Sequence, residues 1–136
     1  MRPRRDRRDI EQKVVAMSDA LLDRTTLDIL ERRLGRDRVA KVVAAQLSHG
    51  AVQMQELAGL ERAPDRARIK AIAHQMAGSS GSIGLTSLGE AAANLEMIIA
   101  DLPDDGLPNV VHRLRDLMTA SFSRLTEAYP EAAATP

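Results

Sequence analysis

Apolar side chains recur at helical spacing along most of this chain, and the pattern is clearest in residues 110–129. At about 100° per residue, one face there collects Val110, Val111, Leu114, Leu117, Met118, Phe122, Leu125 and Tyr129. The apolar residues are nearly all Ala, Leu, Val, Ile and Met, since the chain has one Phe, one Tyr and no Trp. Such a composition favours helix over sheet. The sequence therefore predicts an all-α fold.

The 136 residues suit one domain with a single core. Residues 1–9 are dense in charge and are predicted to be a disordered basic tail. A weakly amphipathic stretch follows at residues 10–22, with Val14, Val15, Met17, Leu21 and Leu22. Helices are expected at about 26–34 and 37–60. Three more are expected: one from Pro64 past position 80, one at about 88–99 and a last one at about 110–129. The prediction is an antiparallel four-helix bundle over residues 10–129, with one or two short N-terminal helices and a flexible tail at 130–136.

Individual residues mark where the predicted helices begin and end. Gly35 stands where a helix C-terminal glycine is expected, and Pro64 is placed to begin the next helix. The spacing of Ser87 and Glu90 matches a capping box at the start of a later helix. The Leu-Pro-Asp-Asp-Gly stretch at 102–106 is a turn by composition, and Pro130 is expected to close the last helix.

Composition also excludes several classes of function. Without cysteine there are no disulfides, thiolate zinc sites or cysteine catalysis. Basic and acidic residues balance at 19 each, and no aromatic residues lie among the arginines of residues 2–8, so nucleic acid is not an expected partner. The N-terminus lacks the apolar region of a secretory signal, and no apolar run is long enough to span a membrane. A soluble, cytoplasmic protein is expected.

His74 is the residue that most strongly indicates chemistry. It lies opposite the apolar face formed by Ile69, Ile72, Ala73, Met76, Ser80 and Ile83. Its helical neighbours at i−7, i−3, i+4 and i+7 are all small: Ala67, Ala71, Gly78 and Gly81. An imidazole that faces solvent among small residues is accessible to another molecule. Taken alone, an incidental surface histidine is the more common reason for such a position, and His49 and His112 are interpreted that way. The three histidines show no metal-binding spacing, and no metal site is expected.

The stretch from Gly78 to Gly84 allows two interpretations. By composition it is a Gly/Ser loop. If the helix continues through it, Gly78 and Gly81 each cost roughly 0.5–1 kcal/mol relative to Ala. Packing does not account for that cost beside an exposed histidine, whereas a docking surface does, because glycine lets the backbone of a partner come close.

The sequence around His74 resembles the histidine-containing phosphotransfer (HPt) domains of phosphorelays. The resemblance rests on His74-Gln-Met-Ala-Gly78-Ser79-Ser80, followed by Gly84, Leu88 and the pair Leu95-Glu96, with Leu34-Gly35 upstream. It covers about residues 22–128. In that family a lysine usually stands where this chain has Ala77.

The resemblance implies a bundle that presents His74 on its outer surface. It implies that His74 accepts a phosphoryl group from a response-regulator receiver aspartate, or from a hybrid histidine kinase, and hands it to another receiver. Imidazole, with an unperturbed pKa of about 6.5, is a competent nucleophile for this near neutral pH. Receiver domains carry their own Mg²⁺, so no cofactor is expected on this chain. The chain is not expected to be an autonomous kinase, because it lacks a glycine-rich nucleotide loop.

The expected phosphate environment is Lys70, Ala77, Gly78 and Ser79. Lys70, one turn before His74, is a candidate substitute for the lysine that the family has at position 77. Ser79 is expected to cap or pack at a helix contact, Ser80 to point inward, and Glu96 either to frame the surface near His74 or to be solvated. The partner is expected to dock over Ala67, Ala71, Gly78 and Gly81, on a protein that is a monomer or weakly associating.

Two other functions remain open. The bundle could bind a receiver or kinase without carrying phosphate, with Ala77 as a sign of lost chemistry. It could also be a generic helical adaptor with a coincidental motif, which predicts no receiver binding.

Overall fold

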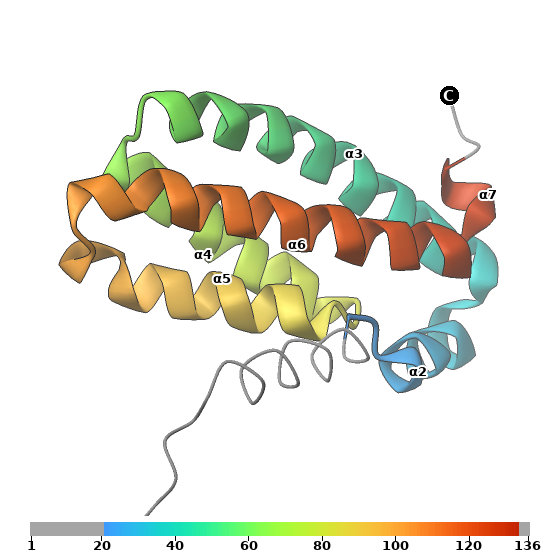
Figure 1. Ribbon diagram of the computed structural model, residues 1–136. Helices are drawn as coiled ribbons and strands as arrows, with labels where there is room; N and C mark the ends of the chain where they lie inside the picture. The colour runs from blue at the N-terminus through green and yellow to red at the C-terminus, as the bar shows by residue number, and fades with distance from the viewer. Residues whose placement is uncertain (1–20, 134–136) are drawn as a thin grey trace, which may run out of the picture.

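The computed structural model describes residues 21–133, and these are helical nearly throughout (Figure 1). A short helix α2 (Arg24–Leu34) precedes the four long ones, α3 (Arg36–Arg62), α4 (Arg66–Ser82), α5 (Thr86–Ile98) and α6 (Leu107–Ala128). The 3₁₀ turns η1 (Ile99–Asp101) and η2 (Asp104–Gly106) join α5 to α6, and α7 (Pro130–Ala133) follows α6. The predicted all-α, four-helix bundle with a short N-terminal helix is confirmed. The predicted basic tail at residues 1–9 and most of the stretch at 10–22 lie outside the described residues.

The bundle is closed by contacts between neighbouring helices. Helix α4 packs most extensively on α5, α3 packs on α6, and the pairs α5–α6 and α3–α4 complete the ring. Each long helix supplies its apolar face to the core, which includes Val43, Leu57, Ile72, Met76, Leu88, Ala92, Val111, Met118 and Leu125. The described part of the chain contains no helix both long and apolar enough to cross a membrane.

Helix ends follow local chemistry. Asp23 and Asp65 cap α2 and α4, and their side chains accept hydrogen bonds from the backbone N–H groups of Thr25 and Arg68. Gly35 adopts φ +84° between α2 and α3, as its predicted place after a helix requires. Pro64 was expected to begin α4, but it precedes the cap, because the Asp65 side chain takes that role.

Two sequence predictions differ from the structure. The prediction of a capping box at Ser87–Glu90 is wrong. Helix α5 begins at Thr86 without a side-chain cap, and Ser87 is a buried residue of its first turn. Where a flexible tail was expected after Pro130, residues Pro130–Ala133 form α7, and Ala132 is buried. In both places long-range packing decides the structure, which spacing along the chain does not show.

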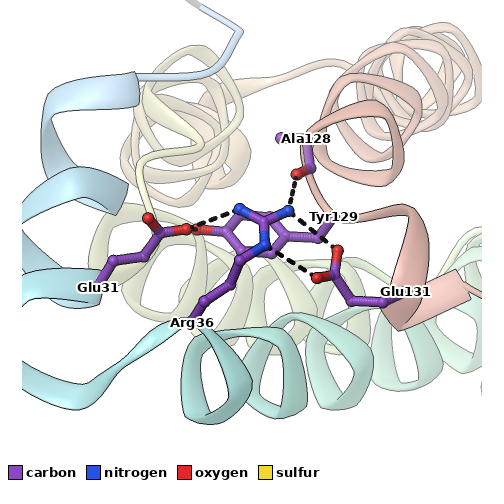
Figure 2. Close-up of polar contacts among 5 residues, drawn as sticks. All are labelled: Glu31, Arg36, Ala128, Tyr129 and Glu131. Carbon is purple, nitrogen blue, oxygen red and sulfur yellow. Dashed lines mark hydrogen bonds and ion pairs between the residues drawn. The ribbon is translucent and has the colours of Figure 1, made fainter.

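A polar cluster joins α2, α3 and the C-terminal end of the bundle (Figure 2). The guanidinium of Arg36 donates to Glu31 (2.9 Å), to Glu131 (2.9 and 3.0 Å) and to the carbonyl of Ala128 (2.8 Å), and it lies 4.5 Å from the ring centroid of Tyr129. The Tyr129 hydroxyl donates to Glu31 at 2.6 Å. The hydrogen bond with Arg36 lowers the pKa of Glu131, and burial, with the bond to Glu31, raises the pKa of Tyr129. The cluster therefore fixes α7 against the junction of α2 and α3.

Candidate functional site

Helix α4 continues through the glycine-containing stretch and ends at Ser82. The helical interpretation of this segment is therefore the correct one, and the loop begins only at Ile83. The face predicted to be apolar is buried, including Ile69, Ile72, Ala73, Met76, Ser80 and Ile83. Burying that face directs the opposite side of α4 outward. His74 lies on this outer side, with 74% of its side chain exposed.

Small residues surround His74 on the outer face of α4. Ala67, Gly78 and Gly81 are exposed, and Ala71 is half-buried. A Cβ atom built at Gly78 or Gly81 would meet nothing within 4 Å. The glycines are therefore not needed for packing within the described residues, and they leave the backbone of α4 open at the surface beside His74.

Glu96 of α5 contacts one edge of the His74 ring. Its Oε1 atom lies 2.8 Å from Nδ1 of His74. A carboxylate can only accept a hydrogen bond, so Nδ1 carries the hydrogen. In a neutral imidazole with hydrogen on Nδ1, the lone pair is on Nε2. The pair thus leaves the lone pair on Nε2, on a ring that faces solvent.

Close packing of α4 and α5 brings these two residues together. Gly89 of α5 faces α4, where an added Cβ would lie 3.4 Å from the backbone nitrogen of Gly81 and 3.6 Å from the carbonyl oxygen of Ala77. Glu96 follows Gly89 by two helical turns and so lies on the same side of α5. The sequence left the role of Glu96 open, and the structure places it against His74.

The other predicted site residues are placed differently. Lys70 is exposed one turn before His74, and Ala77 is half-buried on the side of α4 that faces α5. Ser79 is not brought to His74: its hydroxyl accepts from Nε2 of Gln46 on α3 (3.3 Å) and donates to the carbonyl of Met76 (3.4 Å). The packing role expected for Ser79 agrees with these contacts, whereas a place in the phosphate environment does not follow from them.

Met97 is not among the site residues predicted from the sequence. Its side chain is 79% exposed, beside Glu96 on α5. On a helical projection, the exposed residues Ala93 and Met97 lie next to Glu96 on the solvent side. The apolar surface around His74 therefore extends from α4 onto α5. The signal was available in the sequence, because the core positions of α5 at 88, 92, 95 and 99 leave position 97 outside.

The other two histidines are surface residues, as expected. His112 contacts Glu61 (2.9 Å) and Asp116 (3.5 Å), and His49 is exposed on α3. Among residues 21–133, no three His, Asp or Glu side chains are grouped so that they could hold a metal ion.

Comparison with known proteins gives a family match. The family model for the Hpt domain matches residues 24–124, from the start of α2 into the last turns of α6. Neither a search of curated proteins nor a search of solved structures gave a match. The family match spans most of the chain and includes the helix that presents His74. The chain belongs to the Hpt domain family, whose members carry phosphoryl groups in phosphorelays.

Proposed function

We propose that the chain shuttles phosphoryl groups between receiver aspartates through His74. The observation that carries this proposal is the outward-facing ring of His74, with Nδ1 held by Glu96 at 2.8 Å and Nε2 left open. In the forward step the Nε2 lone pair attacks the phosphorus of an aspartyl phosphate, a P–N bond forms, and the P–O bond to the aspartate breaks. The aspartate leaves as a carboxylate, and the second transfer reverses these bonds on another receiver.

Glu96 contributes to this step through charge. Attack by Nε2 puts positive charge on the ring, because Nδ1 keeps its hydrogen. The carboxylate of Glu96 faces that hydrogen and opposes the developing charge. Its side chain is 29% exposed, so solvent screens the interaction only in part. Glu96 is a positioning residue in this scheme, since it acts through His74.

Lys70 is proposed to take over part of the role of the lysine that the family usually has at the position of Ala77. It is the only lysine of α4 and lies one turn before His74, on the exposed side. A flexible ammonium there can donate to phosphate oxygens. Lys70→Ala is expected to slow transfer or shorten the phosphohistidine lifetime, whereas Lys41→Ala, an exposed lysine on α3, is expected to change neither. Equal values for the two variants would remove Lys70 from the proposal.

The receiver is proposed to dock over Ala67, Ala71, Gly78 and Gly81 of α4 and over Met97 of α5. Small side chains on α4 permit close approach of a partner helix, and Met97 adds adaptable apolar area. The interface is expected to be small, as for transient exchange complexes.

The test is phosphotransfer from a panel of phosphorylated receiver domains to the wild-type chain and to His74→Ala. We expect acid-labile label on the wild type and none on His74→Ala. The matched controls are His49→Ala and His112→Ala, which remove the other two histidines and should keep the label. Label on His74→Ala would overturn the proposal.

Ala77 supports the alternative of a phosphate-independent binder, because a lysine that could hold phosphate is missing there. That function predicts receiver binding without label, and full regulatory effect from His74→Ala. The same experiment separates the two functions.

A further inference from the structure

A groove runs between α5 and α6, on the side of α5 that faces away from Glu96. It has a volume of about 590 Å³ and is mostly apolar. Its apolar lining includes Ala91, Leu95 and Ile98 of α5 and Val110, Leu117 and Ala120 of α6. Ile98 is 39% exposed within it. The groove is thus an apolar face that no described helix covers.

The described chain begins in this groove. Leu21 is only 7% exposed and belongs to the groove lining. Two residues later, the backbone N–H of Asp23 donates to the carbonyl of Gly84 at 2.7 Å, just before α5. The chain is therefore anchored beside the start of α5, and the twenty residues before Leu21 join the bundle at the groove.

The residues before Leu21 include apolar side chains at helical spacing, an apolar stripe that ends at Leu21. Ile10, Val14 and Met17 precede Leu21 at helical spacings of four, three and four residues, and they share one face of a helix. A helix from Ile10 to Leu21 would span about 16 Å, at 1.5 Å per residue. The groove extends along α6 from Val110 to Ala120, about 15 Å by the same rise. The lengths of stripe and groove agree.

We propose that residues 10–20 bind in the α5–α6 groove of their own chain as an amphipathic helix. Met17, Val14 and Ile10 would then pack in turn beyond Leu21, against the apolar residues of both helices. Because the chain already enters the groove at Leu21, the effective concentration of the segment is high and little chain entropy is lost on docking. The groove and Glu96 lie on different sides of α5, so the docked segment leaves His74 open to a receiver.

The test uses the natural lack of cysteine in this chain, which lets a single introduced thiol report its surroundings. Val14→Cys and Val15→Cys form a matched pair, because both replace valine at adjacent positions and only Val14 lies on the stripe. We expect a maleimide to label the full-length Val14→Cys chain at least about tenfold more slowly than Val15→Cys. Equal rates would overturn the proposal.

A second substitution tests whether the groove provides the protection. Ile98→Asp places a charge in the groove, whereas Met97→Asp places the same charge on the neighbouring residue outside it. The Val14→Cys rate should rise to the Val15→Cys rate in the Ile98→Asp background and stay low with Met97→Asp, while circular dichroism shows both variants folded. If Val14→Cys is still labelled slowly in the Ile98→Asp background, the groove is not what protects the thiol, and the proposal is overturned. Protection that grows with protein concentration assigns the groove to a second copy and also overturns the proposal.

Discussion

Glu96 on α5 lies 2.8 Å from Nδ1 of His74 on α4, and this contact selects which ring nitrogen of His74 is free. The two residues are 22 positions apart and belong to different helices, so the state of the imidazole depends on how α4 and α5 pack.

Replacement of Glu96 should slow phosphotransfer without removing it. One hydrogen bond contributes about 0.5–1.5 kcal/mol, so Glu96→Ala is expected to reduce the transfer rate roughly three- to tenfold. Glu96→Gln should restore part of the rate, because its amide oxygen can still accept from Nδ1. Glu90→Ala, at an exposed position of the same helix, is the control. Nitrogen NMR of His74 should show a smaller Nδ1–H population in Glu96→Ala, and an unchanged population would contradict the positioning role.

A bulky residue at Gly78 should block the receiver while preserving the fold. Space within 4 Å is open both at Gly78 on α4 and at Gly59 on α3, so Gln fits at either position. Each substitution is expected to stabilise its helix by about 0.5–1 kcal/mol. Only Gly78→Gln should lower receiver affinity and transfer, measured by titration calorimetry and label transfer. Equal transfer by Gly78→Gln and Gly59→Gln variants would place the docking surface elsewhere.

The two glycines with positive φ should differ in how they tolerate alanine. Gly35 and Gly84 both have φ +84°, a conformation that costs a non-glycine residue about 1–3 kcal/mol. A Cβ at Gly35 meets nothing within 4 Å, but at Gly84 it would lie 2.7 Å from the carbonyl oxygen of Asp23. Gly84→Ala is therefore expected to lower the free energy of unfolding by about 1–3 kcal/mol more than Gly35→Ala. Urea unfolding of both variants measures the difference, and equal losses would refute the close approach at Gly84.

Tyr129 should ionise at a higher pH in the folded chain than in the unfolded chain. Its pKa is raised by burial and by the hydrogen bond to Glu31. A group whose pKa is raised on folding adds stability below its unfolded pKa, near 10, and this stability is lost as the pH rises toward the folded value. Because the chain has one tyrosine and no tryptophan, tyrosinate absorbance follows this residue alone. Tyr129→Phe should remove the alkaline loss of stability, and a wild-type titration near pH 10 with the fold intact would contradict the prediction.

Much of the fold follows from local patterns in the sequence. The spacing from Val110 to Tyr129 predicts α6, and Gly35 marks the junction of α2 and α3, because these signals lie within a few residues of each other. His74 also follows from the sequence, since burial of the opposite face of α4 fixes where it points.

The features that the sequence left open or did not predict depend on distant contacts. The continuation of α4 through Gly78 is stabilised by packing on α5, which outweighs the low helix propensity of glycine. Similarly, α7 forms where Arg36, nearly a hundred residues earlier, bonds to Glu131. The position of Ser79 against Gln46 of α3 also depends on tertiary structure.

Gly89 of α5 lies at the contact with α4, two turns before Glu96. A Cβ at position 89 would already be in van der Waals contact with the backbone of α4, and Glu96 reaches the imidazole across the same pair of helices. A larger residue at position 89 would push the two helices apart and weaken the contact between Glu96 and His74. A substitution at position 89 would therefore change the contact between His74 and Glu96 while both of those residues stay the same.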